Sequence, residues 1–117
     1  MITAKQTKKR MTDQPRWWKV ALMDFVDDFR RSKDVAAIAE PFLLDDEEKD
    51  TVLAGTIETL CDEMELAIPK WVGGVPASTE PLFLSRAETL KAFSILESPV
   101  RFRLRKVFVL DNFLARV

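Results

Sequence analysis

Residues 84–117 read LSRAETLKAFSILESPVRFRLRKVFVLDNFLARV, and this stretch contains the two clearest helix starts of the chain. Ser85 is followed three residues later by Glu88, the spacing of a capping box, in which each side chain accepts a hydrogen bond from the other residue's backbone N–H. The pair Ser98-Pro99 is a second start, because serine suits the N-cap and proline suits the first helical position, where an N–H has no partner. The stretch therefore predicts one helix that ends near Glu97 and another that begins at Pro99.

The residues after Pro99 fit either a helix or a strand. Val100, Phe102 and Leu104 alternate with arginines, which is the period of a half-buried strand. A helical spacing is also satisfied, by Val100, Leu104, Val107 and Phe108. The Ser-Pro start favours the helix, and a strand over the same residues stays the alternative.

Apolar residues recur at helical spacing in the N-terminal third of the chain as well. A helix is predicted from about residues 13–15 to Ser32, with an apolar stripe made of Trp18, Leu22, Phe25, Val26 and Phe29. Trp17 lies about 100° from this stripe, so it is either folded over the edge of the core or exposed as a contact residue. Residues 34–40 predict a short second helix, which Pro41 ends.

The most regular helical pattern lies in the middle of the chain. Asp45 followed by Glu48 resembles a capping box, and the helix that it starts is predicted to run to Pro69. Its apolar stripe consists of Leu53, Ile57, Leu60, Cys61, Met64 and Ile68. Gly55 destabilises a helix by about 1 kcal/mol relative to alanine. This cost indicates that another helix packs closely at Gly55.

Residues 68–83 hold three of the six prolines and two of the three glycines, which excludes a regular helix. The segment is apolar enough to pack over the core, and a small hairpin turning at Gly73-Gly74 is an alternative. The whole pattern predicts a mostly α fold, a small single-domain bundle of four to five helices over residues 13–117 with this irregular Pro-rich segment. The predicted core contains Leu22, Phe25, Phe29, Leu53, Ile57, Leu60, Met64, Leu90, Phe93 and Leu96.

Length and composition set further bounds. The 117 residues suit one domain, and 47% apolar with 32% charged residues is typical of a globular protein. The single cysteine excludes an internal disulfide and suits a reducing cytosol. No apolar run approaches the length that spans a bilayer, and no secretory signal is visible at the N-terminus. These observations predict a cytoplasmic protein without membrane association.

The net charge of −1 hides a strong segregation of charge along the chain. Residues 1–12 carry four cations and no acid, whereas residues 34–68 carry eleven acids and one lysine, a balance of −10. Residues 69–117 carry eight cations and four acids. Residues 1–12 lack periodicity and are predicted to be a flexible basic arm. The acidic middle is predicted to pair with the basic ends, within one chain or across a dimer.

The residue types argue against catalysis. Histidine and tyrosine are absent, which removes the commonest general base and the commonest metal ligand. Cys61 lies on an apolar stripe beside acids, and both features oppose a reactive thiolate. Glu58, Asp62 and Glu65 can line one side of a helix, where a solvated acidic face is expected in preference to a metal site. We therefore predict no catalytic residue, no cofactor and no metal.

The candidate functional residues are those of an interaction surface. They are Trp17, Arg101, Phe102, Arg103, Arg105, Lys106 and Phe113. A homodimer through the C-terminal helix is predicted, because Phe102 and Phe113 lie on a different side of that helix from Val100 and Leu104. Arg101, Arg105 or Arg116 would then meet acids of the 45–65 region on the second subunit. Structural salt links within one chain are the other explanation for these cations.

The C-terminal half also resembles a family of small bacterial proteins without a known activity. The resemblance rests on Glu97-Ser98-Pro99, Phe102-Arg103, Val107-Phe108-Val109 and Asn112-Phe113-Leu114, together with Leu60-Cys61-Asp62-Glu63 and Pro69-Lys70-Trp71. It implies a bacterial source and an association with two-gene pairs of the toxin–antitoxin kind, and it carries over no site residue. The predicted function is a non-enzymatic protein-interaction protein, the partner-binding half of such a pair. The alternative is a nucleic-acid-binding regulator that uses the basic arm and the cations of residues 101–106.

Overall fold

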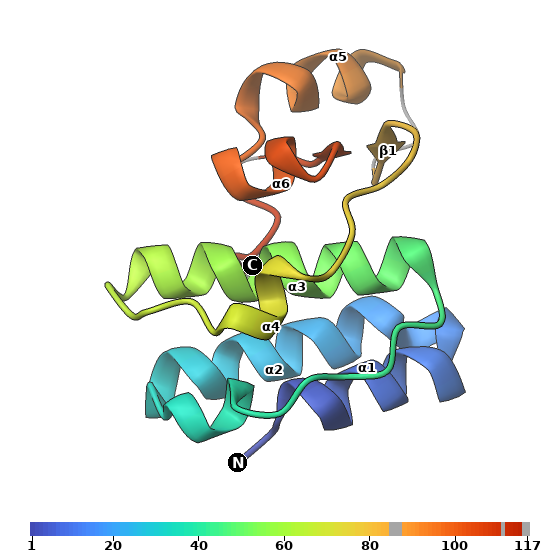
Figure 1. Cartoon of the computed structure of the whole chain (residues 1–117). Coiled ribbons are helices and arrows are strands. Elements are labelled where there is room, and N and C mark those ends of the chain that lie inside the picture. The colour runs from blue at the N-terminus through green and yellow to red at the C-terminus, as the bar shows by residue number, and fades with distance from the viewer. Residues whose placement is uncertain (85–87, 111, 116–117) are drawn as a thin grey trace.

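Two layers make up the computed structural model, which describes residues 1–84, 88–110 and 112–115, without the side chains of residues 88, 89, 92 and 96. The first layer contains three long helices, α1 (Ala4–Asp13), α2 (Trp18–Ser32) and α3 (Glu47–Glu63). The second lies over α3 and contains α5 (Glu88–Glu97), α6 (Val100–Leu104) and the strands β1 (Leu82–Phe83) and β2 (Val107–Phe108) (Figure 1). The fold is thus the predicted mostly α single domain.

Helix α1 replaces the predicted flexible basic arm, and that prediction is wrong for residues 4–12. Thr3 caps the helix by accepting a hydrogen bond from the backbone N–H of Gln6, and the Gln6 side chain accepts one from the N–H of Thr3. Ala4 and Met11 are fully buried, because α1 packs antiparallel against α2 as a helical hairpin. The sequence of this segment looks polar because its apolar stripe is short.

Helix α2 confirms the first predicted amphipathic pattern. A short 3₁₀ turn, η1 (Pro15–Trp17), leads into it, and its buried face includes Leu22, Phe25 and Phe29. Lys33 ends the helix in the left-handed conformation, with a φ of 53°. The short helix predicted over residues 34–40 is a 3₁₀ helix, η2 (Val35–Ile38), capped by Asp34.

Helix α3 confirms the central pattern in its first four turns and corrects both predicted ends. The N-cap is Asp46, one residue later than predicted, and its side chain accepts a hydrogen bond from the backbone N–H of Lys49. The helix ends at Glu63 instead of continuing to Pro69, because Glu65 is left-handed, with a φ of 56°. This conformation lets the N–H of Leu66 bond to the carbonyl of Cys61, which closes the helix end.

The Pro-rich segment is irregular, as predicted, and packs on the core. It contains the one-turn helix α4 (Lys70–Gly73), which brings the number of α-helices in the described residues to six, one more than expected. The alternative of a hairpin at Gly73-Gly74 is wrong, since α4 ends there. Val72 and Val75 are buried, and the indole N–H of Trp71 donates to the carbonyl of Ile38 at 3.0 Å.

In the C-terminal layer the predicted helix after Pro99 is confirmed for residues 100–104, and the strand alternative is wrong for Val100, Phe102 and Leu104, on which it rested. Helix α6 covers residues 100–104, and β2 covers residues 107 and 108, pairing in parallel with β1 at Leu82↔Val107 and Phe83↔Phe108. The continuous C-terminal helix is therefore wrong, because left-handed Lys106, with a φ of 59°, turns the chain into the strand. The N-cap of α6 is Pro99, and the capping box predicted at Ser85 lies outside the described residues.

The core agrees with the predicted list in the first layer and differs in the second. Leu22, Phe25, Phe29, Leu53, Ile57 and Leu60 are fully buried, and Met64 is half-buried. Leu90 and Phe93 are exposed at 39% and 54%, which corrects their assignment to the core, and the side chain of Leu96 lies outside the described residues. The reason is that α5 lies on the outside of the second layer (Figure 1).

Candidate interaction surface

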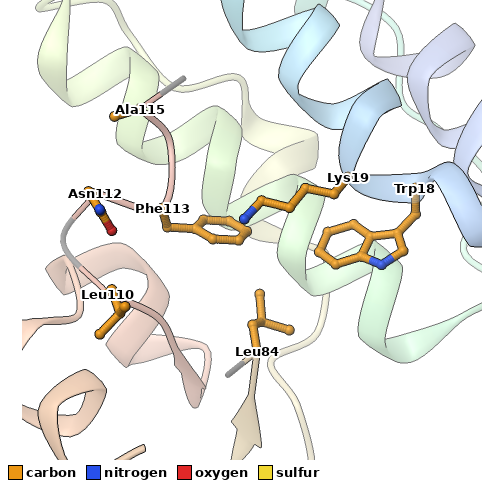
Figure 2. A pocket seen from close by; sticks show the side chains of 7 residues that line it. All are labelled: Trp18, Lys19, Leu84, Leu110, Asn112, Phe113 and Ala115. Atoms are coloured by element: carbon orange, nitrogen blue, oxygen red, sulfur yellow. The ribbon is translucent and has the colours of Figure 1, made fainter. Parts of the chain in front are cut away.

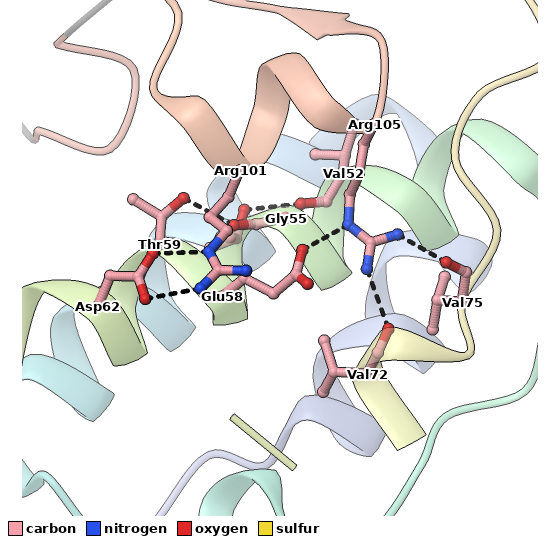
Figure 3. A network of polar contacts seen from close by, with 10 residues as sticks. Val52, Gly55, Glu58, Thr59, Asp62, Val72, Val75, Arg101 and Arg105 are labelled. Carbon is pink, nitrogen blue, oxygen red and sulfur yellow. Dashed lines mark hydrogen bonds and ion pairs between the residues drawn. The ribbon is translucent and has the colours of Figure 1, made fainter. Parts of the chain in front are cut away.

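Helix α6 lies directly on α3 because α3 carries a glycine at the crossing point. A Cβ atom added to Gly55 would lie 3.0 Å from Cδ1 of Phe102 and 3.4 Å from Cδ of Arg105. The close helix contact predicted at Gly55 is thereby confirmed. This contact also sets the cations of α6 above the acids of α3 (Figure 3).

Arg105 joins three elements through a buried guanidinium. Its Nε donates to Oε1 of Glu58 at 2.6 Å, and its two terminal nitrogens donate to the carbonyls of Val75 at 2.7 Å and Val72 at 2.9 Å (Figure 3). Glu58 is buried as well. The group therefore holds α6 to α3 and to the chain around α4, and it is engaged inside the protein.

Arg101 makes a second ion pair one turn earlier in α6. Its Nε and a terminal nitrogen donate to the two carboxylate oxygens of Asp62 at 2.7 Å and 3.1 Å. These hydrogen bonds lower the pKa of Asp62 below its ordinary value of 3.8. Two acids of the face that was predicted to be solvated, Glu58 and Asp62, are thus paired with arginines. The ion pairs between acids and arginines that the sequence predicts are formed within one chain.

The Asp62–Arg101 pair predicts an acid-sensitive contribution to stability. A carboxyl group with a lowered folded-state pKa stabilises the fold above its unfolded-state pKa, about 3.9, and this contribution is lost as the pH falls through the lower, folded-state pKa. We expect urea denaturation midpoints to fall between neutral and acidic pH, and to fall less in Asp62→Asn. A variant with the same acid sensitivity as the native chain would contradict this assignment.

A second buried network ties α1 to the start of α3. The ammonium of Lys8 lies 2.6 Å from Oδ1 of Asp45, 2.6 Å from Oδ1 of Asp50 and 2.7 Å from the carbonyl of Leu43. Burial alone would lower the pKa of Lys8, but the hydrogen bonds and charges of the two aspartates outweigh it and raise the pKa. The charge segregation predicts that the basic N-terminal residues pair with the acidic middle, as Lys8 does, but it does not identify which residues meet.

The seven predicted interaction residues divide into buried and accessible groups. Phe102 and Phe113 are buried and pack edge to face, with ring centroids 5.7 Å apart, and Arg105 is buried with Glu58. As contact residues these three are wrong, because α6 turns its Phe102 side toward α3. Trp17 is 55% exposed, Arg103 and Lys106 are exposed, and Arg101 is half-buried against Asp62.

A cavity of about 330 Å³ lies between the start of α2 and the C-terminal segment. Figure 2 shows Trp18 and Lys19 facing Phe113 across it, and the Lys19 ammonium lies 4.8 Å from the Phe113 ring centroid. The remaining lining residues are Leu84, Leu110, Asn112 and Ala115. Its described lining contains no carboxylate or thiol, so it offers no general base or nucleophile from the residues that the structure shows.

The thiol and the acids give no sign of chemistry in the described part of the chain. Cys61 is fully buried, as predicted, and burial, followed by the charges of Asp62 and Glu58, raises the pKa of its thiol. A thiol with a raised pKa is a poor nucleophile. Among residues 1–84, 88–110 and 112–115 no group of three or more His, Cys, Asp or Glu side chains is placed to hold a metal ion.

Exposed apolar residues line two hollows that share Pro76. Leu104 lines one hollow of about 330 Å³ and Leu44 lines another of about 380 Å³, and Pro76 lines both. Leu43, Leu44, Val100 and Leu104 are exposed at 72%, 50%, 62% and 69%. We call this surface the Leu44–Leu104 strip; it consists of Leu44, Pro76, Ala77, Leu104 and, one turn before Leu104 on α6, Val100.

Sequence reasoning missed this strip. Its one local signal is the pair Leu43-Leu44, two large apolar residues between a proline and an acidic run. The helical spacing correctly places Val100 and Leu104 on a different side of the helix from Phe102. The prediction that the Phe102 side faces a partner is wrong. The Phe102 side is buried and the Val100 side is exposed.

Comparison of the chain with models of protein families, with curated proteins and with solved structures finds no match in any of the three. The resemblance of the C-terminal half to small bacterial proteins therefore stays a prediction. None of the described helices combines the length and the apolar character that crossing a membrane requires.

Proposed function

We propose that this chain is a non-enzymatic protein-interaction protein of the bacterial cytoplasm, the partner-binding half of a two-gene pair of the toxin–antitoxin kind. The observation that carries the proposal is the large apolar side chains exposed on the second layer. Leu90 and Phe93 lie three residues apart on α5, and Val100 and Leu104 lie four residues apart on α6. Such spacing puts each pair on one side of its helix, and exposed apolar groups of this kind mark protein contacts.

The cations of the chain support a protein partner over a nucleic acid. In the basic segment before Thr12, Lys5, Lys9 and Arg10 form ion pairs with acids of the same chain, and Lys8 is buried. Arg101 and Arg105 are paired with Asp62 and Glu58. Each cation engaged in this way is less available to neutralise a phosphate, and phosphate neutralisation supplies most of non-specific binding to nucleic acid.

The proposed absence of catalysis rests on residue chemistry. The chain has no histidine, and its single thiol is buried and has a raised pKa. The cavity beside Trp18 is lined, in its described part, by apolar groups, one amide and one ammonium. These groups suit binding better than proton transfer or nucleophilic attack.

The nucleic-acid alternative is tested by salt. We expect no retention of duplex DNA by the purified chain at low ionic strength. Binding that is measurable there and weakens steeply toward physiological salt would favour the regulator instead, because such a slope reports released counterions.

The protein partner is tested by co-expression with the product of the neighbouring gene. The native chain is expected to form a complex that purifies as one species, and Phe93→Asp on the outer face of α5 is expected to abolish it. Val35→Asp is the matched control, because Val35 is similarly exposed, at 55%, but lies on η2 in the first layer. No complex, or a complex that survives Phe93→Asp, would contradict the proposal.

A further inference from the structure

The two ends of the Leu44–Leu104 strip are connected through Pro76. The hollow lined by Leu44 and the hollow lined by Leu104 share Pro76, and Ala77 lines the second hollow beside it. Pro76 and Ala77 are exposed, so the strip is accessible along its length. A partner that covers Leu44 can therefore reach Leu104 at the same time.

The ends carry opposite charge. Residues 43–50 contain five acids and one lysine, a balance of −4, and Asp45, Asp46 and Glu47 line the hollow beside Leu44. Residues 100–106 contain four cations and no acid, a balance of +4. Lys8 offsets one acid at the first end. At the second end Arg101 and Arg105 are paired with Asp62 and Glu58, and Arg103 donates to the carbonyl of Ser98. The positive character of this end therefore rests on Lys106, which is exposed beside α6.

A surface with an apolar centre, an acidic end and a basic end is complementary to itself when turned through 180°. We propose that the Leu44–Leu104 strip binds the same strip of a second copy of this chain, so that the acidic end of each copy meets the basic end of the other. A two-fold axis then repeats each contact twice, which is the usual symmetry of a homodimer. The apolar side chains supply most of the affinity, and the charges select the antiparallel orientation.

This homodimer differs from the one that the sequence predicts. Phe102 and Arg105, which were expected at the interface, are buried within the chain, and Arg116 lies outside the described residues. The exposed side of α6, with Val100 and Leu104, takes their place. The inference rests on the proposed function as an interaction protein, and it identifies one partner as the chain itself.

Charged substitutions at the two leucines test the orientation as well as the contact. Light scattering on a sizing column is expected to give the mass of a dimer for the native chain at high micromolar concentration. Leu44→Lys sets a cation against the partner's basic end, and Leu104→Glu sets an anion against the partner's acidic end. Each is expected to weaken the dimer by at least about tenfold, the size of effect typical of a central interface residue. The reverse changes, Leu44→Glu and Leu104→Lys, set an anion against the partner's basic end and a cation against its acidic end. Both are expected to keep the dimer.

Mixing the two disruptive variants gives the sharpest result. In a heterodimer of Leu44→Lys with Leu104→Glu, the new lysine faces the new glutamate, and the other half of the interface is native. Two chains that are each monomeric alone are therefore expected to form a dimer when mixed in equal amounts. Both positions are exposed, so circular dichroism should show native helix content for each variant.

Three outcomes would overturn the inference. They are a native chain that stays monomeric at every concentration, a native dimer that is unchanged by both disruptive variants, and a mixture that stays monomeric. The outcome is separable from the test of the protein partner, because Phe93 lies on α5, outside the strip. A monomeric chain whose complex with the neighbouring gene product is lost in Phe93→Asp would overturn self-association and leave the proposed function intact.

Discussion

Replacement of Arg105 by methionine is expected to lower the free energy of unfolding by about 3–5 kcal/mol. Methionine keeps much of the volume of the side chain but leaves the carboxylate of Glu58 buried without its cation. The carbonyls of Val72 and Val75 lose their donors in the same step. Removing one partner of a buried ion pair is costly because the other charge stays desolvated. Urea denaturation followed by circular dichroism measures the change.

Two further variants separate the buried charge from other effects of the substitution. Arg103→Met, at an exposed position of the same helix, removes a hydrogen bond to the Ser98 carbonyl but no buried ion, and is expected to lower stability by at most about 1.5 kcal/mol. The double variant Arg105→Met with Glu58→Leu is expected to recover much of the loss, because an apolar pair of similar size replaces the buried ions. Equal effects of Arg105→Met and Arg103→Met would show that the buried pair does not stabilise the fold.

Phe102→Ala is expected to destabilise the protein by about 3–5 kcal/mol, the usual cost of removing a buried aromatic ring. Phe102 is fully buried, lies against Gly55 of α3 and packs edge to face on Phe113. Its loss leaves a cavity where the second layer meets the first. Thermal denaturation should show a lower transition temperature for this variant, whereas Val35→Ala, at an exposed position outside the Leu44–Leu104 strip, should leave it nearly unchanged.

The contact with Gly55 gives this prediction an independent check. In the native chain an alanine at position 55 would crowd the Phe102 ring, whereas in Phe102→Ala the added methyl group occupies vacated space. The change in the free energy of unfolding caused by Gly55→Ala is therefore expected to be more favourable in the Phe102→Ala background than in the native chain, by about 1 kcal/mol or more. A double-mutant cycle with no coupling would mean that the two residues are not in contact.

The parts of the fold that the sequence predicts well are those controlled by neighbouring residues. The apolar stripe of α2 and the glycine contact at position 55 follow from helical spacing and residue geometry, and both agree with the structure. The pairing of acids and arginines also follows, since segments of opposite charge are expected to meet. Local patterns hold here because tertiary contacts reinforce them.

The remaining features depend on contacts that spacing does not encode. Helix α1 was missed because its stability comes from packing on α2 and from the ion pairs of Lys8, with partners 37 and 42 positions away. The early end of α3 and the turn after α6 depend on left-handed Glu65 and Lys106, residue types that seldom adopt this conformation. A helical pattern continues through both positions, so the pattern alone predicts helices that are too long.

The candidate surface was predicted only in part for the same reason. Residue type singles out Trp17 and the cations after Pro99 as candidates, and Trp17 is exposed, but which side of α6 faces α3 depends on where Gly55 lies in the folded chain. Phe102 fits the space over that glycine and is buried, and Leu104 is left in solvent. The exposure of the α6 residues of the strip is thus a consequence of the way α6 crosses α3.

The anchoring of α5 bears on how this protein can diverge during evolution. Both ends of the segment that contains α5 are fixed to one strand, since the N–H of Leu84 bonds to the carbonyl of Phe108 at 3.2 Å and the Ser98 hydroxyl bonds to both backbone groups of Val109. A segment whose two ends are held side by side can change its sequence or length at a small entropic cost. Mutations between these anchors can therefore accumulate with little effect on the three-helix layer. Selection can alter the outer face of α5 from one lineage to the next and re-target the protein while its body is conserved.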